Sequence, residues 1–238
     1  MKSSLSLTRK LLAACAVTMA ASAAHADITV FTDRAAFLNA VSGSATDTFD
    51  DLAMVETGSP LSRLAGAYTY QVSAGPGDGG FYPSGSGGDI WLSGTMSSDV
   101  ITFNAFSSGV FGFGGNFFGT DSFGAFMPDR TIVLSAVSGA DSETFTLSNA
   151  SQDAFVAFLS DRPLTSVSFQ NMEDDGTVYW AAANNVVMAV PEPATWSMLL
   201  GGLGVAALAR RRSLTSKQAK TVALTSHHNH TGEKDETH

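Results

Sequence analysis

The body of this sequence, residues 27–189, offers carboxylates but few other groups for chemistry. It contains no histidine, cysteine or lysine. Ser-His-Asp and Cys-His catalysis, Schiff-base formation, a lysine-bearing phosphate loop and an ordinary zinc site are therefore excluded. Two kinds of chemistry survive. A glycosidase needs only two suitably spaced carboxyl groups, and calcium is bound by carboxylate, amide and backbone oxygens.

The acidic residues fall into two clusters, Asp50-Asp51 and Glu173-Asp174-Asp175. Neighbouring residues on a strand point to opposite faces, so neither cluster is by itself a catalytic pair. The segments "GNFFGTD" and "NMEDDG" supply the candidate contacts for calcium or a glycan, although neither has the spacing of a complete calcium loop: Asn116, Asp121, Asn171, Asp174 and Asp175. We expect no catalytic residues and no cofactor, with calcium as the alternative.

Aromatic side chains that stack on sugar rings are the other candidate contacts. They are Tyr68, Tyr70, Tyr82, Trp91, Tyr179 and Trp180. Because Trp91 and Trp180 stand in apolar, strand-like segments, core packing is the favoured interpretation for these two.

Charge separates the body from its ends. Residues 27–190 hold eighteen acidic residues and four arginines, so their net charge is 4 − 18 = −14. Phosphate contacts need lysine and arginine, so this balance argues against nucleic acid as a partner. It suits an exported soluble domain.

The elements that must position these residues are mostly short strands. The segment "FTDRAAFLNAVSG" predicts one N-terminal helix, with Thr32 or Asp33 as its cap, an apolar face of Phe37, Ala40 and Val41, and Gly43 at its end. Short apolar runs bounded by turn residues then predict an all-β fold, an antiparallel, jelly-roll-like β-sandwich. The candidate strands are Asp47–Phe49, Ala67–Val72, Ile90–Leu92, Val100–Phe103, Gly109–Phe113, Thr131–Val137, Glu143–Leu147, Phe155–Leu159, Thr165–Gln170, Val178–Ala182 and Val186–Ala189.

Three segments have more specific interpretations. Ser73–Gly88 contains seven glycines and two prolines and predicts an exposed connector, with a binding loop as the alternative. "GFGGNFFG", Gly112–Gly119, indicates a sheet segment that another element approaches closely. "DAFVAFLSD" is apolar on both faces and favours a buried central strand, with a short helix as the alternative.

Residues 1–26 have the pattern of a secretory signal peptide. Lys2, Arg9 and Lys10 precede an apolar run, and Ala24-His25-Ala26 is the expected cleavage site. A lipoprotein box, Leu12 to Cys15, is the competing interpretation. Only four residues separate Lys10 from Cys15, whereas the apolar region of a signal peptide usually has about 7–15 residues.

A proline corner, an apolar run and an arginine triplet follow one another in residues 190–212. The uncharged run 194–209 would form a helix of about 24 Å, short of the ~30 Å hydrocarbon core of a membrane. Arg210, Arg211 and Arg212 predict its cytoplasmic end. The pattern predicts a marginal C-terminal transmembrane helix.

The order of these parts resembles a known signal. Val190-Pro191-Glu192-Pro193-Ala194-Thr195, the glycine-bearing apolar run and the arginine stop together resemble the PEP-CTERM sorting signal of Gram-negative bacteria. The resemblance implies recognition by an exosortase, a membrane protease-transpeptidase, with cleavage near the Pro-Glu-Pro. Proteins with this signal are typical of species that make exopolysaccharide and biofilm matrix. "FTDRAAFLNAVSG" and "YWAAANNVVMAVPEP" also resemble the ends of many bodies in this group, with Asn184-Asn185 where an Asp-Asn pair is common.

The predicted organisation has four parts: a signal peptide, 1–26; an exported domain, 27–189; a sorting and anchor segment, 190–212; and a polar tail, 213–238, whose His227, His228 and His230 suggest metal binding or simple disorder. The leading hypothesis is a non-enzymatic protein. It is exported through the inner membrane, held there by its C-terminus and sorted to the cell surface or matrix, where it binds polysaccharide or serves as a structural component. The alternatives are a carbohydrate-active hydrolase with paired carboxylates and an ice- or surface-binding protein.

Overall fold

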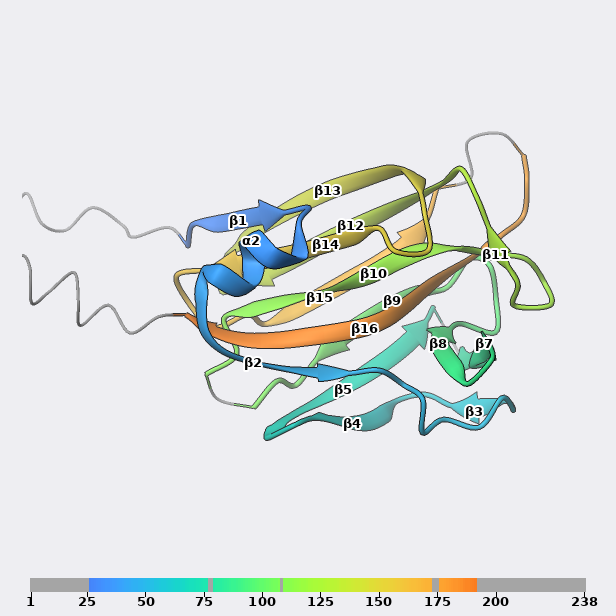
Figure 1. Cartoon of the computed structure of the whole chain (residues 1–238), viewed down its shortest axis with the longest axis horizontal. Coiled ribbons are helices and arrows are strands. Elements are labelled where there is room, and N and C mark those ends of the chain that lie inside the picture. The colour runs from blue at the N-terminus through green and yellow to red at the C-terminus, as the bar shows by residue number, and fades with distance from the viewer. Residues whose placement is uncertain (1–25, 77–78, 108, 173–175, 192–238) are drawn as a thin grey trace, which may run out of the picture. The chain divides into compact units, whose positions relative to one another are not determined.

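The computed structural model describes residues 26–76, 79–107, 109–172 and 176–191. Within these residues the chain forms two facing antiparallel sheets and one short helix near the start of the body (Figure 1). The predicted fold class, an antiparallel β-sandwich with an N-terminal helix, is confirmed. Ala24, Glu192, Pro193, Arg210, Arg211, Arg212 and the tail histidines lie outside the described residues.

The first sheet carries the strand that leads into the sorting segment. Its order is β1 (Ile28–Phe31), β14 (Phe155–Ser160), β10 (Gly112–Thr120), β16 (Trp180–Pro191), β8 (Asp89–Ser93) and β7 (Ser84–Ser86). Two further strands join it: β2 (Val41–Asp47) pairs with β16, and β11 (Phe126–Met127) pairs with β10. The strand β14 lies between β1 and β10, which confirms the buried central strand predicted from "DAFVAFLSD".

The second sheet lies against the inner face of the first. Its order is β13 (Asp141–Ala150), β12 (Arg130–Ser138), β15 (Ser166–Asn171), β9 (Val100–Asn104), β5 (Tyr68–Gly75) and β4 (Leu61–Ala65). A separate two-stranded pair consists of β3 (Thr57–Gly58) and β6 (Gly80–Phe81).

Phenylalanines from both sheets fill the space between them. Phe113 of β10 meets Phe103 of β9 with ring centroids 4.6 Å apart, and Phe117 of β10 meets Phe169 of β15 at 5.1 Å. These rings are almost fully buried, and aromatic pairs at such separations add to the stabilisation from burial alone. The alternation of side chains in the strands therefore produces one continuous core.

The helix α2 (Arg34–Asn39) covers part of the outer face of the first sheet. Its Phe37 packs with Phe155 and Val187 in a second buried cluster. A Cβ atom on Gly112 would lie 3.0 Å from the Phe37 ring and 3.2 Å from Ala189 Cβ. Glycine at this position lets the helix lie close to β10. The close approach predicted from "GFGGNFFG" is confirmed.

The helix is shorter than predicted. Asp33 caps it, since its Oδ1 accepts a hydrogen bond from Ala36 N at 2.7 Å, and the helix ends at Asn39. Val41 and Gly43 do not belong to it, because both lie in β2 and pair with β16. Tertiary pairing thus overrides the local helix signal after Asn39.

Several strand boundaries also differ from prediction. The strand predicted at Asp47–Phe49 is wrong: β2 ends at Asp47, whose Oδ1 accepts from Phe49 N, and Phe49 has a φ of 62°. Gly109–Phe113 is shifted, since β10 begins at Gly112. The two strands predicted within 178–189 form one strand, β16, with a bulge beside Asn185, whose φ is 49°.

The segment Ser73–Gly88 is not a simple exposed connector. Ser73–Gly75 ends β5, and β6 and β7 occupy two further parts of the segment. Phe81, the second residue of β6, is fully buried. The prediction is wrong because glycine-rich composition indicates backbone freedom without excluding short paired strands.

Strand β16 continues into the predicted sorting segment. Val190 pairs with Gly43, and Pro191 pairs with Val41 after a register shift. The boundary predicted between residues 189 and 190 therefore falls inside a strand. Among the described residues, no helix has the length and apolar character needed to cross a membrane. The predicted transmembrane run 194–209 lies outside them.

Candidate functional site

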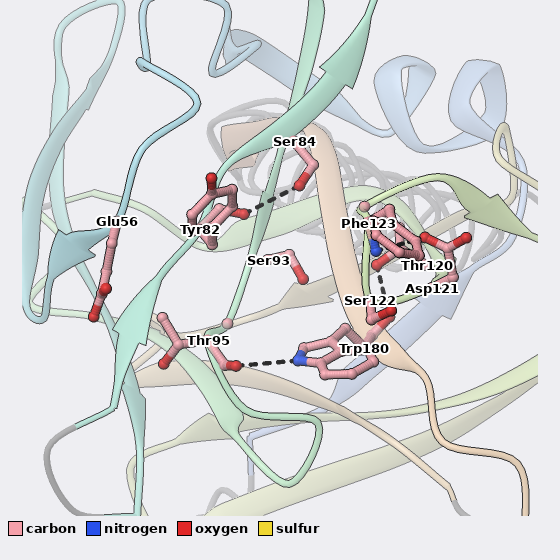
Figure 2. A pocket seen from close by; sticks show the side chains of 12 residues that line it. Glu56, Tyr82, Ser84, Ser93, Thr95, Thr120, Asp121, Ser122, Phe123 and Trp180 are labelled. Atoms are coloured by element: carbon pink, nitrogen blue, oxygen red, sulfur yellow. Dashed lines mark hydrogen bonds between the residues drawn. The ribbon is translucent and has the colours of Figure 1, made fainter.

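A pocket of about 450 Å³ opens at one end of the sandwich (Figure 2). This volume falls within the range of small-molecule sites. The wall comes from the ends of β8, β10 and β16, from the turn between β10 and β11, from the start of β7 and the segment before it, and from the residue before β3. The lining residues are Glu56, Tyr82, Ser84, Ser93, Gly94, Thr95, Thr120, Asp121, Ser122, Phe123, Gly124 and Trp180.

Three aromatic side chains line this pocket. Trp180 begins β16, and its indole Nε1 donates to the carbonyl oxygen of Thr95 at 3.2 Å, which fixes the ring (Figure 2). Tyr82 follows β6 and is 50% exposed. Phe123 lies in the turn between β10 and β11 and is 92% exposed. Apolar side chains that line a pocket and remain exposed to water are available to contact a ligand.

The turn that carries Phe123 is held by Asp121. Asp121 Oδ1 accepts hydrogen bonds from the backbone N–H groups of Phe123 and Ala125, each at 2.9 Å. Gly124 has a φ of 77°, and a Cβ atom there would overlap the side chain of Ser84. The turn therefore packs directly on Ser84, the first residue of β7, and this contact closes one side of the pocket.

Buried hydroxyl groups form another part of the wall. Ser93 Oγ donates to the carbonyl of Ala181 at 3.3 Å, and Thr120 Oγ1 donates to the carbonyl of Trp180 at 3.4 Å. Ser84 Oγ donates to the carbonyl of Tyr82 at 3.3 Å. Because a hydroxyl has one proton and two lone pairs, each of these three presents an acceptor oxygen.

Two carboxylates are the charged groups among the lining residues. Glu56 and Asp121 lie on opposite sides of the pocket, with Ser93 and Thr95 between them (Figure 2). None of the lining residues is arginine, lysine or histidine. Within the described ranges, no group of three or more acidic, cysteine or histidine side chains is placed to hold a metal ion.

Several exposed apolar side chains are close in sequence to the lining residues. Of the large hydrophobic side chains exposed in the described part of the chain, six are lining residues or lie within two positions of one: Met54, Val55, Tyr82, Met96, Phe123 and Val178. Two of them, Tyr82 and Phe123, line the pocket itself and leave exposed rings in its wall.

The predicted contact residues do not come together. Asp121 lines the pocket, whereas Asn116 lies under α2, where Oδ1 accepts from Arg34 Nη2 at 2.9 Å and Nδ2 donates to the carbonyl of Asp153 at 2.8 Å. Asn171 Nδ2 donates to the carbonyl of Tyr179 at 2.7 Å. Asp174 and Asp175 lie outside the described residues. Calcium binding stays a prediction.

Asn184 and Asn185 have structural partners in the bulge of β16. Asn184 Nδ2 donates to Asp89 Oδ1 at 2.7 Å, and its Oδ1 accepts from Asn185 N. The Asn185 carbonyl accepts from Arg34 Nη2 at 3.0 Å, which ties α2 to β16. Burial lowers the pKa of Arg34.

The cluster Asp50-Asp51 is part of a separate polar network. Asp50 Oδ1 accepts from Ile90 N at 3.0 Å, while both oxygens of Asp51 accept from Arg63. Arg63 also binds the buried Asp47, which accepts a further bond from Tyr70 OH at 2.7 Å. These partners satisfy each other within the fold, so the network is structural.

The aromatic candidates divide between core and pocket. Trp91, Tyr70 and Tyr179 are buried, Tyr68 is partly buried against the core, and Tyr82 and Trp180 line the pocket. Core packing is therefore confirmed for Trp91 and wrong for Trp180, which is only partly buried at the strand end. Sequence reasoning did not single out Glu56, Ser84, Ser93, Thr120 or Phe123. An apolar Phe123 inside the turn "TDSFGA" was the available signal.

The C-terminal segment matches a known family model. Residues 189–213 match the model of the PEP-CTERM protein-sorting motif. The chain carries this sorting motif. The match includes Val190, Pro191, Glu192, Pro193 and the three arginines, and it confirms the predicted signal.

Comparisons of the whole chain give weaker similarity. A solved family 29 carbohydrate-binding module is 14% identical over 70% of this chain and 90% of its own, with a TM-score of 0.32. A mutant of such a module complexed with cellulohexaose is 16% identical over 58% of this chain and 93% of its own, with a TM-score of 0.31. These TM-scores are too low to carry an argument about ligands. A comparison with curated proteins finds no match.

Proposed function

We propose that this chain is an exported, non-enzymatic surface or matrix protein whose body binds a saccharide in the pocket lined by Tyr82, Phe123 and Trp180. The sorting motif at residues 189–213 supports the first half of this proposal. The pocket supports the second half. Its ligand is part of the exopolysaccharide around the cell, and no metal cofactor takes part in binding.

The sorting motif directs the protein through two stages. An apolar segment with an arginine stop holds the chain in the inner membrane, and an exosortase then cleaves near the Pro-Glu-Pro and releases the body to the surface or biofilm matrix. Expression with and without an exosortase tests this. The mass should fall and the body should leave the membrane fraction only when the enzyme is present. Unchanged mass, together with normal localisation of Glu192→Ala, would refute sorting.

The combination of aromatic faces and buried hydroxyls is the observation that carries saccharide binding. A sugar ring has apolar C–H faces and a polar edge, so it matches exposed rings beside fixed hydroxyl acceptors. Phe123 is 92% exposed in a turn that Asp121 holds in place, so its position is defined although its ring is in water. Little ordering of the site is then needed on binding.

A glycan array probed with labelled full-length protein in detergent micelles tests this half. Tyr82→Ala and Phe123→Ala should each weaken binding by roughly tenfold, since each removes a stacking surface. Leu64→Ala is the matched control, because Leu64 is 62% exposed on β4 and does not line the pocket. Chelation of calcium should leave binding unchanged. Absence of binding, or equal binding by all variants, would refute the proposal.

A hydrolase is the second candidate, because Glu56 and Asp121 place carboxylates on opposite sides of the pocket. Glycosidases use two carboxyl groups about 5–10 Å apart. Incubation of bound oligosaccharides with the protein, followed by chromatography, separates the two candidates. Binding without shorter products supports a binding protein. Products that disappear in Asp121→Asn would establish the hydrolase.

A further inference from the structure

The pocket has a second property that the saccharide proposal does not use: its charged groups, its hydroxyl groups and its aromatic rings can all interact with a positively charged ligand. We infer that the saccharide bound between Glu56 and Asp121 carries free amino groups, as in a glucosamine polymer. This inference rests on the proposed function and specifies its ligand class.

Charge is the first argument. The lining includes two carboxylates and no arginine, lysine or histidine. Arg63 is engaged by Asp47 and Asp51, and Arg34 by Asn116 and the Asn185 carbonyl, and neither lines the pocket. An acidic sugar would lose hydration without gaining a cationic partner, and it would meet two like charges. An ammonium group would instead meet two carboxylates of opposite charge and no cation among the lining residues.

The polarity of the hydroxyl groups is the second argument. Ser84, Ser93 and Thr120 each donate their proton to a backbone carbonyl and so present lone pairs. An ammonium group is a donor with no acceptor atom, whereas a neutral sugar hydroxyl is both. Acceptor oxygens on the wall can therefore accept hydrogen bonds from an ammonium group, which has only donors to offer.

The aromatic rings are the third argument. The face of an aromatic ring carries partial negative charge and attracts a cation placed over it, most strongly for tryptophan. Trp180, Tyr82 and Phe123 contribute three such rings to one pocket that also holds two carboxylates. Rings beside carboxylates favour an organic cation over a neutral sugar of the same shape.

The net charge of the whole body also favours a cationic ligand. Residues 27–190 carry a net charge of 4 − 18 = −14, and all nine lysines and arginines outside them lie at the two ends of the chain. A negative body attracts a polycation over distances up to the Debye length, about 10 Å at 0.1 M salt. A polymer with repeated ammonium groups is therefore drawn to the body before one unit enters the pocket.

Three oligosaccharides of equal length test the inference with full-length protein in micelles. They are of three kinds: a glucosamine oligomer, its N-acetylated counterpart and a glucose oligomer. The glucosamine oligomer is tested as two samples, one with β-1,4 and one with β-1,6 linkage. The glucosamine oligomer should bind at least about tenfold more tightly than the two neutral oligomers, and the preference should weaken at 1 M salt. Glu56→Gln should weaken glucosamine binding about fivefold and leave neutral sugars unaffected.

Two further variants control this experiment. Asp121→Asn keeps the Oδ1 acceptor of the turn while removing the charge, so it too should reduce the preference for glucosamine. Glu143→Gln removes the same charge as Glu56→Gln from an exposed position on β13 outside the pocket, and it should change nothing. Equal affinity for all three oligomers would overturn the inference and leave the proposed function standing. If the protein binds none of these oligomers and no glycan on the array, both the inference and the proposed saccharide binding are overturned.

Discussion

Arg63 and Asp47 form two parallel hydrogen bonds in the interior of the body, Nε to Oδ2 at 2.9 Å and Nη2 to Oδ1 at 2.7 Å. Both side chains are almost buried, at 10% and 4% exposure. Burial alone would lower the pKa of Arg63, but the hydrogen bonds that it donates to Asp51 and Asp47 and the charge of Asp47 outweigh burial and raise that pKa. Burial, with the nearby Asp47 charge, likewise raises the pKa of Tyr70. This network joins β2, β4 and β5.

Asp47→Asn should destabilise the body by about 3 kcal/mol. The substitution replaces one carboxylate oxygen with an NH₂ group that faces the Arg63 guanidinium, and a buried charge that loses its partner is strongly destabilising. The free energy of unfolding from urea denaturation measures the effect. Asp51→Asn is the control and should cost less than about 1 kcal/mol, since the Asp51 side chain is 70% exposed. Equal effects of both would contradict the role of burial.

Asp51 should give stability a pH dependence in mild acid. The hydrogen bond from Arg63, with its positive charge, lowers the Asp51 pKa in the folded state below the ordinary value of about 3.9. The folded state therefore binds fewer protons than the unfolded state in this range, and stability rises with pH. The contribution is fully present above about pH 4 and is lost as pH falls through the lowered pKa. Urea denaturation of Asp51→Asn between pH 2 and pH 5 should show a shallower slope than wild type.

Patterns within single strands predicted much of this fold. Residue alternation in "ITF", "TFTL" and "SVSF" located β9, β13 and β15, because each strand turns its apolar residues toward the core on one face, fully buried in β9 and β15 and partly buried in β13. The residues at which strands end were harder to predict from the sequence. Phe49 continues the apolar pattern after Asp47, yet the side chain of Asp47 turns the backbone there. Short-range patterns carry little information about such side-chain hydrogen bonds.

The pocket was not predictable in the same way. Glu56, Ser84 and Phe123 come from segments far apart in the sequence, and they are brought together by the pairing of β3 with β6, the pairing of β7 with β8 and the turn after β10. Tyr82 and Asp121 were candidates for different reasons, and no sequence pattern linked them. The sorting motif was readable in full because its parts are contiguous.

Gly112→Ala should destabilise the body by about 1–3 kcal/mol. The added Cβ would lie 3.0 Å from the Phe37 ring and 3.2 Å from Leu159 Cδ1, so α2 has to shift on the sheet. Gly58→Ala is the control, since no atom lies within 4 Å of the added Cβ there. It should change the free energy of unfolding by no more than about 0.5 kcal/mol. Thermal denaturation of the two variants, followed by circular dichroism, distinguishes these outcomes.

Gly124→Ala should weaken both stability and ligand binding. A φ of 77° is unfavourable for alanine by about 1–2 kcal/mol, and the new methyl group would overlap Ser84. The double variant Gly124→Ala with Ser84→Gly removes the overlap but retains the backbone cost, so it should recover part of the lost stability, while binding stays weak because the Ser84 hydroxyl is gone. Denaturation and oligosaccharide titration of both variants measure this. Full recovery would show that the backbone conformation contributes nothing.

Processing by an exosortase should leave Val190 and Pro191 on the released body. Both residues belong to β16 and pair with Gly43 and Val41 of β2, and Phe111 N donates to the Ala189 carbonyl from the other side. A protease needs an accessible backbone, and residues within a paired strand become accessible only after local unfolding. The intact mass of the body released in the presence of the enzyme should therefore correspond to a C-terminus at or after Pro191. A body ending at Ala189 or earlier would show that β16 separates from β2 before cleavage.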